Sequence, residues 1–542
     1  MLLKLDDAPD SQIPQLPQQY ISLSEADHAI QQAIVAQLDN APLRLINTST
    51  GRLCDRGAQI NAFMRSMEYK ELSSSMTHLS VQTEPIREVI TKYFSWVMLS
   101  HTWNNEEPLL RDVQDNDVYT LNPIGVVKLQ KFCKLAHDLG YRWAWVDTCC
   151  IDQSNNVELQ QSVNSMFVWY RRSALTVVYL SDVLSSSQPG ALARSLWNVR
   201  GWTIQELLAP KILLFYQADW TPYLNIRSSN HKGSVTIMQE LEDSTGINAQ
   251  ALVAFYPGMR DAREKLQWAS CRVTTLQEDI AYSLFGIFGV HLPVIYGEKK
   301  QNALGRLLQE IIARSGDISA LDWIGQSSEF NSCLPADITS YTAPSCTLPS
   351  LSEDDIQKSV STLRDVVAME WVSKLYTLLD NLSAPRFANS RLQLPCITFP
   401  VTEIRRNNDA GFFTYNVKAD GLQDLLITTE DRLVQFSPTR RTRQSFLLIR
   451  PWNRYDLELP DFDDLNFDDL EALGSESGSS SEPDMRDLRL IVRLGQPFGA
   501  LLLVQQWGGE FKRIASDNNI IAQVKDATSV DSMMDVRTLE IL

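Results

Sequence analysis

Short apolar runs alternate with segments of helical periodicity between residues 96 and 216. The runs are rich in β-branched and aromatic residues and cover 96–100, 143–147, 176–180 and 211–216. Apolar residues recur every three or four positions across 126–139 and again across 159–170, which predicts two amphipathic helices between the runs. Strands that alternate with helices form mostly parallel sheets covered on both faces. The sequence therefore predicts an α/β core.

Polar and aromatic residues follow the first two predicted strands. Ser100 ends the first run, and His101 and Trp103 follow it. Asp147 ends the second run, and Asp152 lies five positions further on. The carboxyl ends of parallel strands meet at one edge of a sheet, and ligands of open α/β folds bind at that edge. We therefore expect these five side chains to line a small-molecule site.

A third contribution to this edge is expected from the segment after the third run. If Arg200-Gly-Trp-Thr-Ile-Gln-Glu206-Leu-Leu208 is helical, Trp202 and Glu206 stand four residues apart and share one face. A carboxylate beside a large aromatic ring is typical of a ligand site. It is equally consistent with a structural role, in which Glu206 pairs with Arg200 or another basic residue.

The residues around His101 allow several kinds of chemistry. His101 with Asp147 or Asp152 could form a base and its orienting group for hydrolysis, with Ser100 as nucleophile, although no G-x-S-x-G elbow is present. A structural histidine at a strand end is the alternative. The spacing lacks a metal-ligand signature such as H-E-x-x-H, so we expect no metal. The adjacent cysteines at 149 and 150 are interpreted as core thiols.

Composition restricts the classes of partner. The formal net charge of −17 argues against nucleic-acid binding, which normally requires a basic surface. No apolar run approaches the roughly 20 residues of a membrane-spanning helix, and the start lacks the pattern of a secretory signal. The eight cysteines contain no C-x-x-C pair. We therefore expect a cytoplasmic protein with reduced thiols. The sequence contains neither G-x-x-x-x-G-K-[ST] nor G-x-G-x-x-G, the glycine motifs that bind the phosphates of nucleotides, so we expect no nucleotide cofactor.

The length of 542 residues predicts several domains. We expect a flexible arm at 1–42, an α/β domain at 43–325, a helical connector at 326–393 and a β-rich domain at 394–542. Strands of the last domain are expected at 412–417, 425–428, 445–449, 488–492 and 501–504. An acidic, Ser/Gly-rich stretch at about 461–486 interrupts it and predicts a disordered insertion.

Several motifs, in a consistent order, resemble the fungal heterokaryon-incompatibility (HET) domain. The resemblance covers about 43–325 and rests on the segments Leu99-Ser-His-Thr-Trp103, Trp145-Val-Asp-Thr-Cys-Cys-Ile-Asp-Gln153, Trp169-Tyr-Arg171, Arg200-Gly-Trp-Thr-Ile-Gln-Glu206, Arg272-Val-Thr-Thr-Leu-Gln-Glu278-Asp-Ile-Ala-Tyr282 and Pro293-Val-Ile-Tyr-Gly-Glu298. The family resemblance implies a protein of fungal nonself recognition that is linked to regulated cell death.

The resemblance also implies a fold and an activity. HET domains look like remote relatives of TIR domains, whose parallel sheet is flavodoxin-like, so a TIR-like core is expected at about 95–220. Some TIR domains cleave NAD+ with a glutamate in a W-x-x-x-E-like context, which Trp202 and Glu206 match. By this resemblance Glu206 becomes the candidate catalytic residue, and NAD+ would be a substrate rather than a cofactor. The alternative is a non-enzymatic HET module that assembles with itself or with an unknown incompatibility partner.

Overall fold

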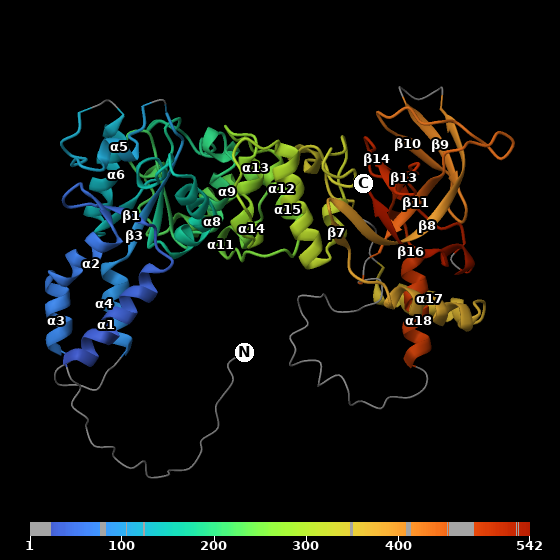
Figure 1. Ribbon diagram of the computed structural model, residues 1–542, viewed down its shortest axis with the longest axis horizontal. Helices are drawn as coiled ribbons and strands as arrows, with labels where there is room; N and C mark the ends of the chain where they lie inside the picture. The colour runs from blue at the N-terminus through green and yellow to red at the C-terminus, as the bar shows by residue number, and fades with distance from the viewer. Residues whose placement is uncertain are drawn as a thin grey trace, which may run out of the picture. The chain divides into compact units, whose positions relative to one another are not determined.

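The computed structural model describes residues 23–75, 83–104, 106–122, 125–346, 351–407, 413–452, 454, 482–526, 528 and 530–542 (Figure 1). The chain forms two compact units. The first comprises Met1–Ser181 with Pro210–Ser229, and the second comprises Asp182–Ala209 with Asn230–Leu542. Residues 1–22 of the expected flexible arm lie outside the described residues. The rest of that arm includes helix α1 (Leu23–Leu38), which buries Ile30 and Ile34.

The first unit contains a six-stranded sheet in the order β2-β1-β4-β3-β5-β6. Its strands are β1 (Arg44–Asn47), β2 (Leu53–Asp55), β3 (Trp96–His101), β4 (Trp143–Trp145), β5 (Leu175–Tyr179) and β6 (Leu213–Tyr216). The last four are parallel neighbours, whereas β1 pairs antiparallel with both β2 and β4. This confirms the mixed α/β class with a parallel sheet. All six residues of β3 are buried, which explains why its first four residues are all apolar.

Two long helices connect the parallel strands, as the periodicity predicts. Helix α6 (Val126–Asp138) joins β3 to β4, and α8 (Asn156–Arg172) joins β4 to β5. The side chain of Asn155 caps the start of α8 by accepting hydrogen bonds from the N–H groups of Val157 and Glu158. The shorter helices of this unit are α2 (Arg56–Met64), α3 (Met67–Ser75), α4 (Thr83–Tyr93), α5 (Leu110–Val113) and α7 (Asp147–Cys150).

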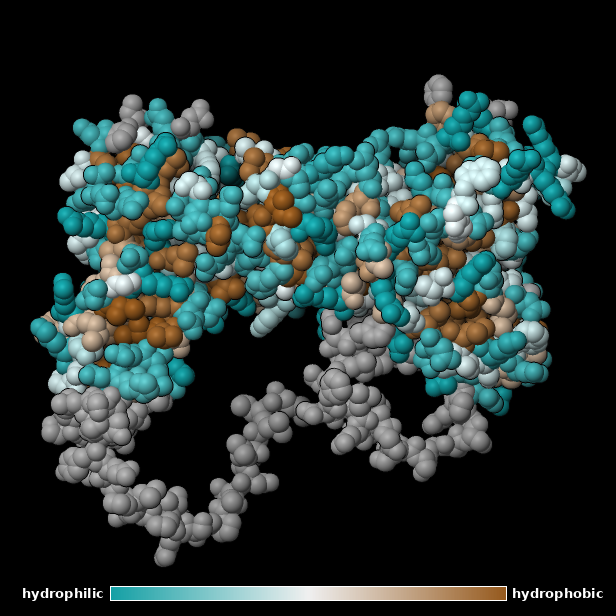
Figure 2. All heavy atoms as spheres, viewed as in Figure 1, coloured by the Kyte–Doolittle hydropathy of each residue, from teal (hydrophilic) through white to brown (hydrophobic). Residues whose placement is uncertain are grey.

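The second unit begins with a helical part. Its helices are α9 (Thr203–Leu208), α10 (Val235–Thr245), α11 (Ala249–Val253), α12 (Ala262–Ser270), α13 (Asp279–Tyr282), α14 (Phe285–Phe288) and α15 (Lys300–Ser315). Two more helices, α16 (Glu353–Arg364) and α17 (Met369–Asp380), precede its strands. On the face in Figure 2, hydrophobic surface gathers over α17 and the later helix α18 (Glu482–Leu494). Trp371 of α17 is 42% exposed and Met485 of α18 is 39% exposed.

The remaining part of the second unit is β-rich, as predicted. Its sheet has the order β10-β9-β8-β11-β13-β14-β16, with β7 also paired to β8. The additional pairing of β8 with β16 closes five strands into a ring, which leaves those strands without a free edge. The strands are β7 (Arg386–Ala388), β8 (Arg391–Arg406), β9 (Thr414–Ala419), β10 (Leu425–Thr428), β11 (Phe446–Pro451), β12 (Phe498–Gly499), β13 (Leu501–Gln505), β14 (Phe511–Ile514), β15 (Ile521–Ala522) and β16 (Val536–Ile541).

The strand expected at 488–492 is wrong. Those residues belong to helix α18 (Glu482–Leu494), in which Leu488, Ile491 and Leu494 are at most 1% exposed. Their spacing of three residues places them on one helical face, so the helical period of the longer segment outweighs the local β-like composition. Residues 461–481 of the expected insertion lie outside the described residues, and its last residues, 482–486, begin α18.

None of the helices in the described ranges is both long enough and apolar enough to cross a membrane.

Candidate functional site

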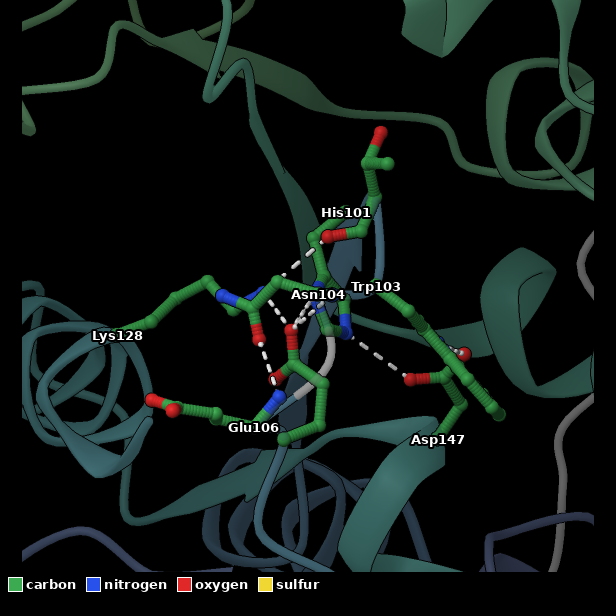
Figure 3. Close-up of polar contacts among 8 residues, drawn as sticks. His101, Trp103, Asn104, Glu106, Lys128 and Asp147 are labelled. Atoms are coloured by element: carbon green, nitrogen blue, oxygen red, sulfur yellow. Dashed lines mark hydrogen bonds and ion pairs between the residues drawn. The ribbon is translucent and has the colours of Figure 1, made fainter. Parts of the chain in front are cut away.

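His101 and Asp147 meet at the carboxyl edge of the parallel sheet. His101 is the last residue of β3, and Asp147 follows β4 as the first residue of α7. The two strands are parallel neighbours with Trp96 opposite Trp143, so their ends lie side by side. The His101 Nε2 atom lies 3.1 Å from Oδ1 of Asp147 (Figure 3). The structure therefore brings together two residues that the sequence predicts at this edge.

Trp103 is held by the same carboxylate. Its indole Nε1–H donates to Oδ2 of Asp147 at 2.8 Å, so each oxygen of that carboxylate engages a different ring (Figure 3). The indole remains 43% exposed, whereas the His101 side chain is 1% exposed. Asp147 thus orients one buried imidazole and one aromatic ring that solvent can reach.

A buried ion pair lies on the other side of the imidazole. Oε1 of Glu107 lies 3.7 Å from Nδ1 of His101, and the same carboxylate pairs with the ammonium of Lys128 from α6. The backbone N–H of Asn104 also donates to Glu107, at 3.0 Å. The side chains of Glu107 and Lys128 are only 6% and 10% exposed. We call His101, Trp103, Glu107, Lys128 and Asp147 the His101 cluster.

The His101 cluster has the geometry of a base with its orienting carboxylate. Asp147 holds Nε2, while Nδ1 has no hydrogen-bond partner among the described residues. An imidazole held by a carboxylate at one nitrogen is the arrangement of a general base and its orienting group, and here Glu107 faces the other nitrogen at 3.7 Å. Ser100 precedes His101 in β3, and successive side chains of a strand point to opposite faces. A role for Ser100 as nucleophile or in ligand binding therefore stays a prediction.

An aromatic pair that we did not predict lies at the same edge. Tyr179 ends β5 in register with His101, and its ring stacks on Trp220 with centroids 4.5 Å apart. The Tyr179 hydroxyl donates to the carbonyl of Ala218 at 3.0 Å. Burial raises the pKa of Tyr179, and the nearby carboxylate of Glu107 adds to this rise. No motif marked this pair, because Trp220 follows a strand end and is separated from Tyr179 by 41 positions in the chain.

The carboxylate of Asp152 forms hydrogen bonds with a residue two positions further along the chain. Its Oδ1 accepts the N–H of Ser154 at 3.0 Å and the hydroxyl of the same serine at 2.6 Å, and these bonds lower the pKa of Asp152. Within the described ranges, no hydrogen bond or ion pair joins Asp152 to the His101 cluster. A role for Asp152 in ligand binding therefore stays a prediction.

Trp202 and Glu206 belong to the second unit. Glu206 lies in α9 and is 5% exposed, and it interacts electrostatically with the buried guanidinium of Arg272. The Nη1 group of Arg272 donates to the carbonyl of Arg200 at 2.9 Å and to the hydroxyl of Thr203 at 2.8 Å. This arrangement fits the structural interpretation of Glu206. Because the His101 cluster lies in the first unit, a pocket shared with Glu206 stays a prediction.

Asp279 is the partner of Trp202. The Trp202 Nε1–H donates to Oδ2 of Asp279 at 3.1 Å, and the Tyr296 hydroxyl is a second hydrogen-bond partner of this carboxyl. Burial raises the pKa of Asp279 from 3.8 to about 6. A carboxylate with this pKa can change its protonation state near neutral pH. The sequence places Asp279 in a recognisable motif but gives no sign of its burial.

Cys149, which lies at this edge, is not activated. A hydrogen bond to Cys150 and burial together raise the pKa of Cys149 well above its usual value, so its thiol stays protonated. Across the described ranges, no group of three or more His, Cys, Asp or Glu side chains is placed to hold a metal ion.

Comparisons with known proteins support a HET domain in this chain. Residues 96–194 match the family model described as heterokaryon incompatibility protein (HET). The vegetative incompatibility protein HET-E-1 of Podospora anserina is 38% identical to this chain over 236 residues. The aligned part covers 42% of this chain and only 17% of that relative. No solved structure matches the chain. The family match begins at the first residue of β3 and contains the whole His101 cluster.

Proposed function

We propose that this chain acts in fungal nonself recognition of the heterokaryon-incompatibility type, and that its HET domain triggers regulated cell death. The observation that carries this proposal is the family match at 96–194, together with the similarity to a vegetative incompatibility protein. The matched segment coincides with the parallel strands β3 to β5 and their connecting helices. The death-inducing activity is thus assigned to the first unit and the short segment that follows it.

Within this domain, the His101 cluster is the proposed effector site. Burying a histidine, a lysine and two carboxylates at a strand edge is costly compared with apolar packing of the same volume. Clusters of buried ionisable groups are frequent at functional sites. The cluster lies at the carboxyl end of β3 and β4, where open α/β folds bind ligands. The exposed face of Trp103 provides contact area for a ligand or partner.

The proposal is tested by inducible expression of the full chain in a fungal host. We expect expression to reduce the number of viable cells, and we expect His101→Gln to restore growth at the same protein level. His137→Gln is the matched control, because His137 is an exposed histidine in the last turn of α6 and lies outside the cluster. Killing by the His101→Gln protein equal to that of the wild type would contradict the assignment of the site.

A more specific form of the proposal is that the domain kills by cleaving NAD+. The parallel strands run in the order β4-β3-β5-β6, which supports a relation to the flavodoxin-like order 2-1-3-4-5 of TIR-like sheets. In this reaction, the bond between nicotinamide and ribose breaks, and water supplies a hydroxyl to the ribose. A desolvated carboxylate such as Glu206, 5% exposed on α9, would stabilise the oxocarbenium-like ribose.

The competing form is a non-enzymatic module that signals by assembling with itself or with a partner. It is favoured by the electrostatic interaction of Glu206 with Arg272, which gives the carboxylate a structural role. Release of nicotinamide from NAD+ by the purified chain separates the two forms. The enzymatic form predicts release that Glu206→Gln lowers about 10²-fold or more.

The control for this assay is Glu240→Gln, because Glu240 is also a buried glutamate of the second unit and is 6% exposed. No nicotinamide release from a preparation that kills cells, or equal release by Glu206→Gln, would favour the non-enzymatic form.

A further inference from the structure

A cavity of about 720 Å³ lies within the second unit. It is lined by the loop before α12, by the segment that follows α15, and by residues of β11 to β14. This volume falls in the range of sites that hold small molecules, about 300–1,000 Å³. The cavity is separate from the His101 cluster, which lies in the first unit. The proposed function therefore leaves it without a role.

Cations outnumber carboxylates in the lining of the cavity. The whole chain carries a net charge of −17, so a wall with excess positive charge is unlike the rest of the molecule. The cationic residues of the lining are Arg260, Arg450, Arg454 and Arg513, and the acidic ones are Asp261, Asp317 and Asp322.

Two of the three aspartates are engaged with other groups. Asp322 accepts the N–H of Cys346 at 2.8 Å and lies 3.7 Å from Nε of Arg263, which is not part of the lining. Asp317 accepts the N–H of Ser319 at 2.8 Å. Each of these two carboxylates therefore has a hydrogen-bond partner other than the arginines of the cavity.

Arg513 is a buried cation that neutral groups hold in place. Its guanidinium donates to the backbone carbonyls of Leu321 at 2.9 Å, Cys333 at 3.3 Å and Trp323 at 3.1 Å. Among the described residues, no carboxylate lies within ion-pair distance of it. Burial lowers the pKa of Arg513 to about 10, which still leaves the group charged at neutral pH. The Asp322 carboxylate acts on this buried charge only from beyond ion-pair distance, so an anion in the cavity would add to its compensation.

The cationic groups are fixed in position before any ligand binds. The guanidinium of Arg513 stacks on Trp323 at 3.9 Å, and that of Arg450 stacks on Phe498 at 4.9 Å. Arg450 also donates to the carbonyl of Leu494 at 2.8 Å. Such stacking and hydrogen bonding lower the entropy cost of ordering a long side chain around a ligand.

A buried hydrogen-bond donor belongs to a residue of the same lining. The indole Nε1–H of Trp452 is buried and has no hydrogen-bond acceptor among the residues that the structure describes. Buried donors are nearly always paired, so this N–H is available to donate to an acceptor oxygen of a ligand. Phosphate and carboxylate oxygens accept hydrogen bonds from N–H donors as well as from guanidinium groups.

We propose that this cavity binds a small organic anion, recognised through a phosphate or carboxylate group by the arginines of its wall. The cavity volume sets the size of the ligand, and the excess of arginines sets its charge. The site gives the second unit a ligand-binding role that is independent of the chemistry at the His101 cluster.

The test is isothermal titration of the purified full chain with adenosine monophosphate, citrate and inorganic phosphate, with neutral adenosine as the uncharged comparison. We expect at least one anion to bind with one-to-one stoichiometry, more weakly as salt increases, and no binding of adenosine. Absence of binding by all three anions, or equal binding of adenosine and its monophosphate, overturns the proposal.

Two double variants locate the binding site. Arg260→Gln with Arg454→Gln removes two cations of the lining, and we expect the Kd to rise about tenfold or more. Arg441→Gln with Arg443→Gln makes the same change in charge at exposed positions outside the lining and should leave the Kd nearly unchanged. An equal rise in Kd for both double variants would show non-specific attraction and contradict the site. Thermal unfolding of each protein confirms that it is folded.

Discussion

Nε2 of His101 lies 3.1 Å from Oδ1 of Asp147, although 46 positions separate the two residues in the chain. The contact exists because β3 and β4 are parallel neighbours whose carboxyl ends share one edge of the sheet. The same carboxylate also holds the indole of Trp103. Asp147 is therefore the residue on which the geometry of the His101 cluster depends.

We expect Asp147→Asn to abolish cell killing while the protein still folds. An asparagine has one acceptor oxygen and no charge, so it cannot hold the His101 and Trp103 donors as a carboxylate does. The free energy of unfolding should fall by about 1–3 kcal/mol. Viability after induced expression and urea denaturation measure the two effects.

The matched control for this prediction is Asp152→Asn. It makes the same chemical change five positions later, in a carboxylate that bonds to the neighbouring Ser154. We expect this variant to kill as the wild type does. Loss of killing by both variants would show that Asp152 also belongs to the site, as the sequence predicts.

Breaking the Glu107–Lys128 pair should destabilise the protein more than removing both charges. Lys128→Met leaves a carboxylate that is 6% exposed without its counter-charge, which costs about 3–5 kcal/mol. The double variant with Glu107→Gln should recover part of that loss. A double-mutant cycle in urea measures the coupling energy between the two charges.

The control is Lys131→Met, at an exposed position of the same helix, which should change stability by no more than about 0.5 kcal/mol. Additive effects would contradict a buried ion pair.

Asp279 should make stability decrease as pH rises. Its pKa is raised from 3.8 to about 6, so the folded protein binds this proton more tightly than the unfolded chain does. The stabilisation is complete below pH 3.8 and is lost as pH rises through 6, with a total on the order of 3 kcal/mol. The difference in unfolding free energy between wild type and Asp279→Asn, measured from pH 4 to 7.5, isolates this effect. A constant difference across that range would contradict it.

Gly201 should not tolerate a methyl group. A Cβ at this position would lie 2.3 Å from Cγ2 of Thr274, while the Gly201 N–H is fixed by a 2.8 Å bond to the carbonyl of Val273. Overpacking of this kind typically costs about 1–3 kcal/mol. Gly201→Ala should therefore lower the melting temperature by several degrees. Gly233→Ala, where a Cβ would meet nothing within 4 Å, is the control and should unfold near the wild-type temperature.

Local periodicity was sufficient for the parallel strands of the first unit and the two long helices between them. The apolar runs that became β3 to β6 and the amphipathic segments of α6 and α8 were predicted because their patterns of burial repeat within a few residues. The position of His101, Trp103 and Asp147 at one edge followed from the parallel arrangement. The same local reasoning failed at α18, where Leu488 to Val492 has a β-like composition inside a helix of 13 residues.

The sequence by itself determined the parallel α/β core, the β-rich character of the last third and the polar residues that end β3 and β4. Only the tertiary structure decided which charged and aromatic side chains from other parts of the chain contact these polar residues. Glu107 and Lys128 look like ordinary surface residues in the chain, and they are identified by their burial beside His101. Arg513 lies on a short strand and lines a cavity. The backbone carbonyls within residues 321–333 that hold its guanidinium come from a distant part of the chain. Burial and pairing across long stretches of chain depend on packing, which residue spacing does not encode.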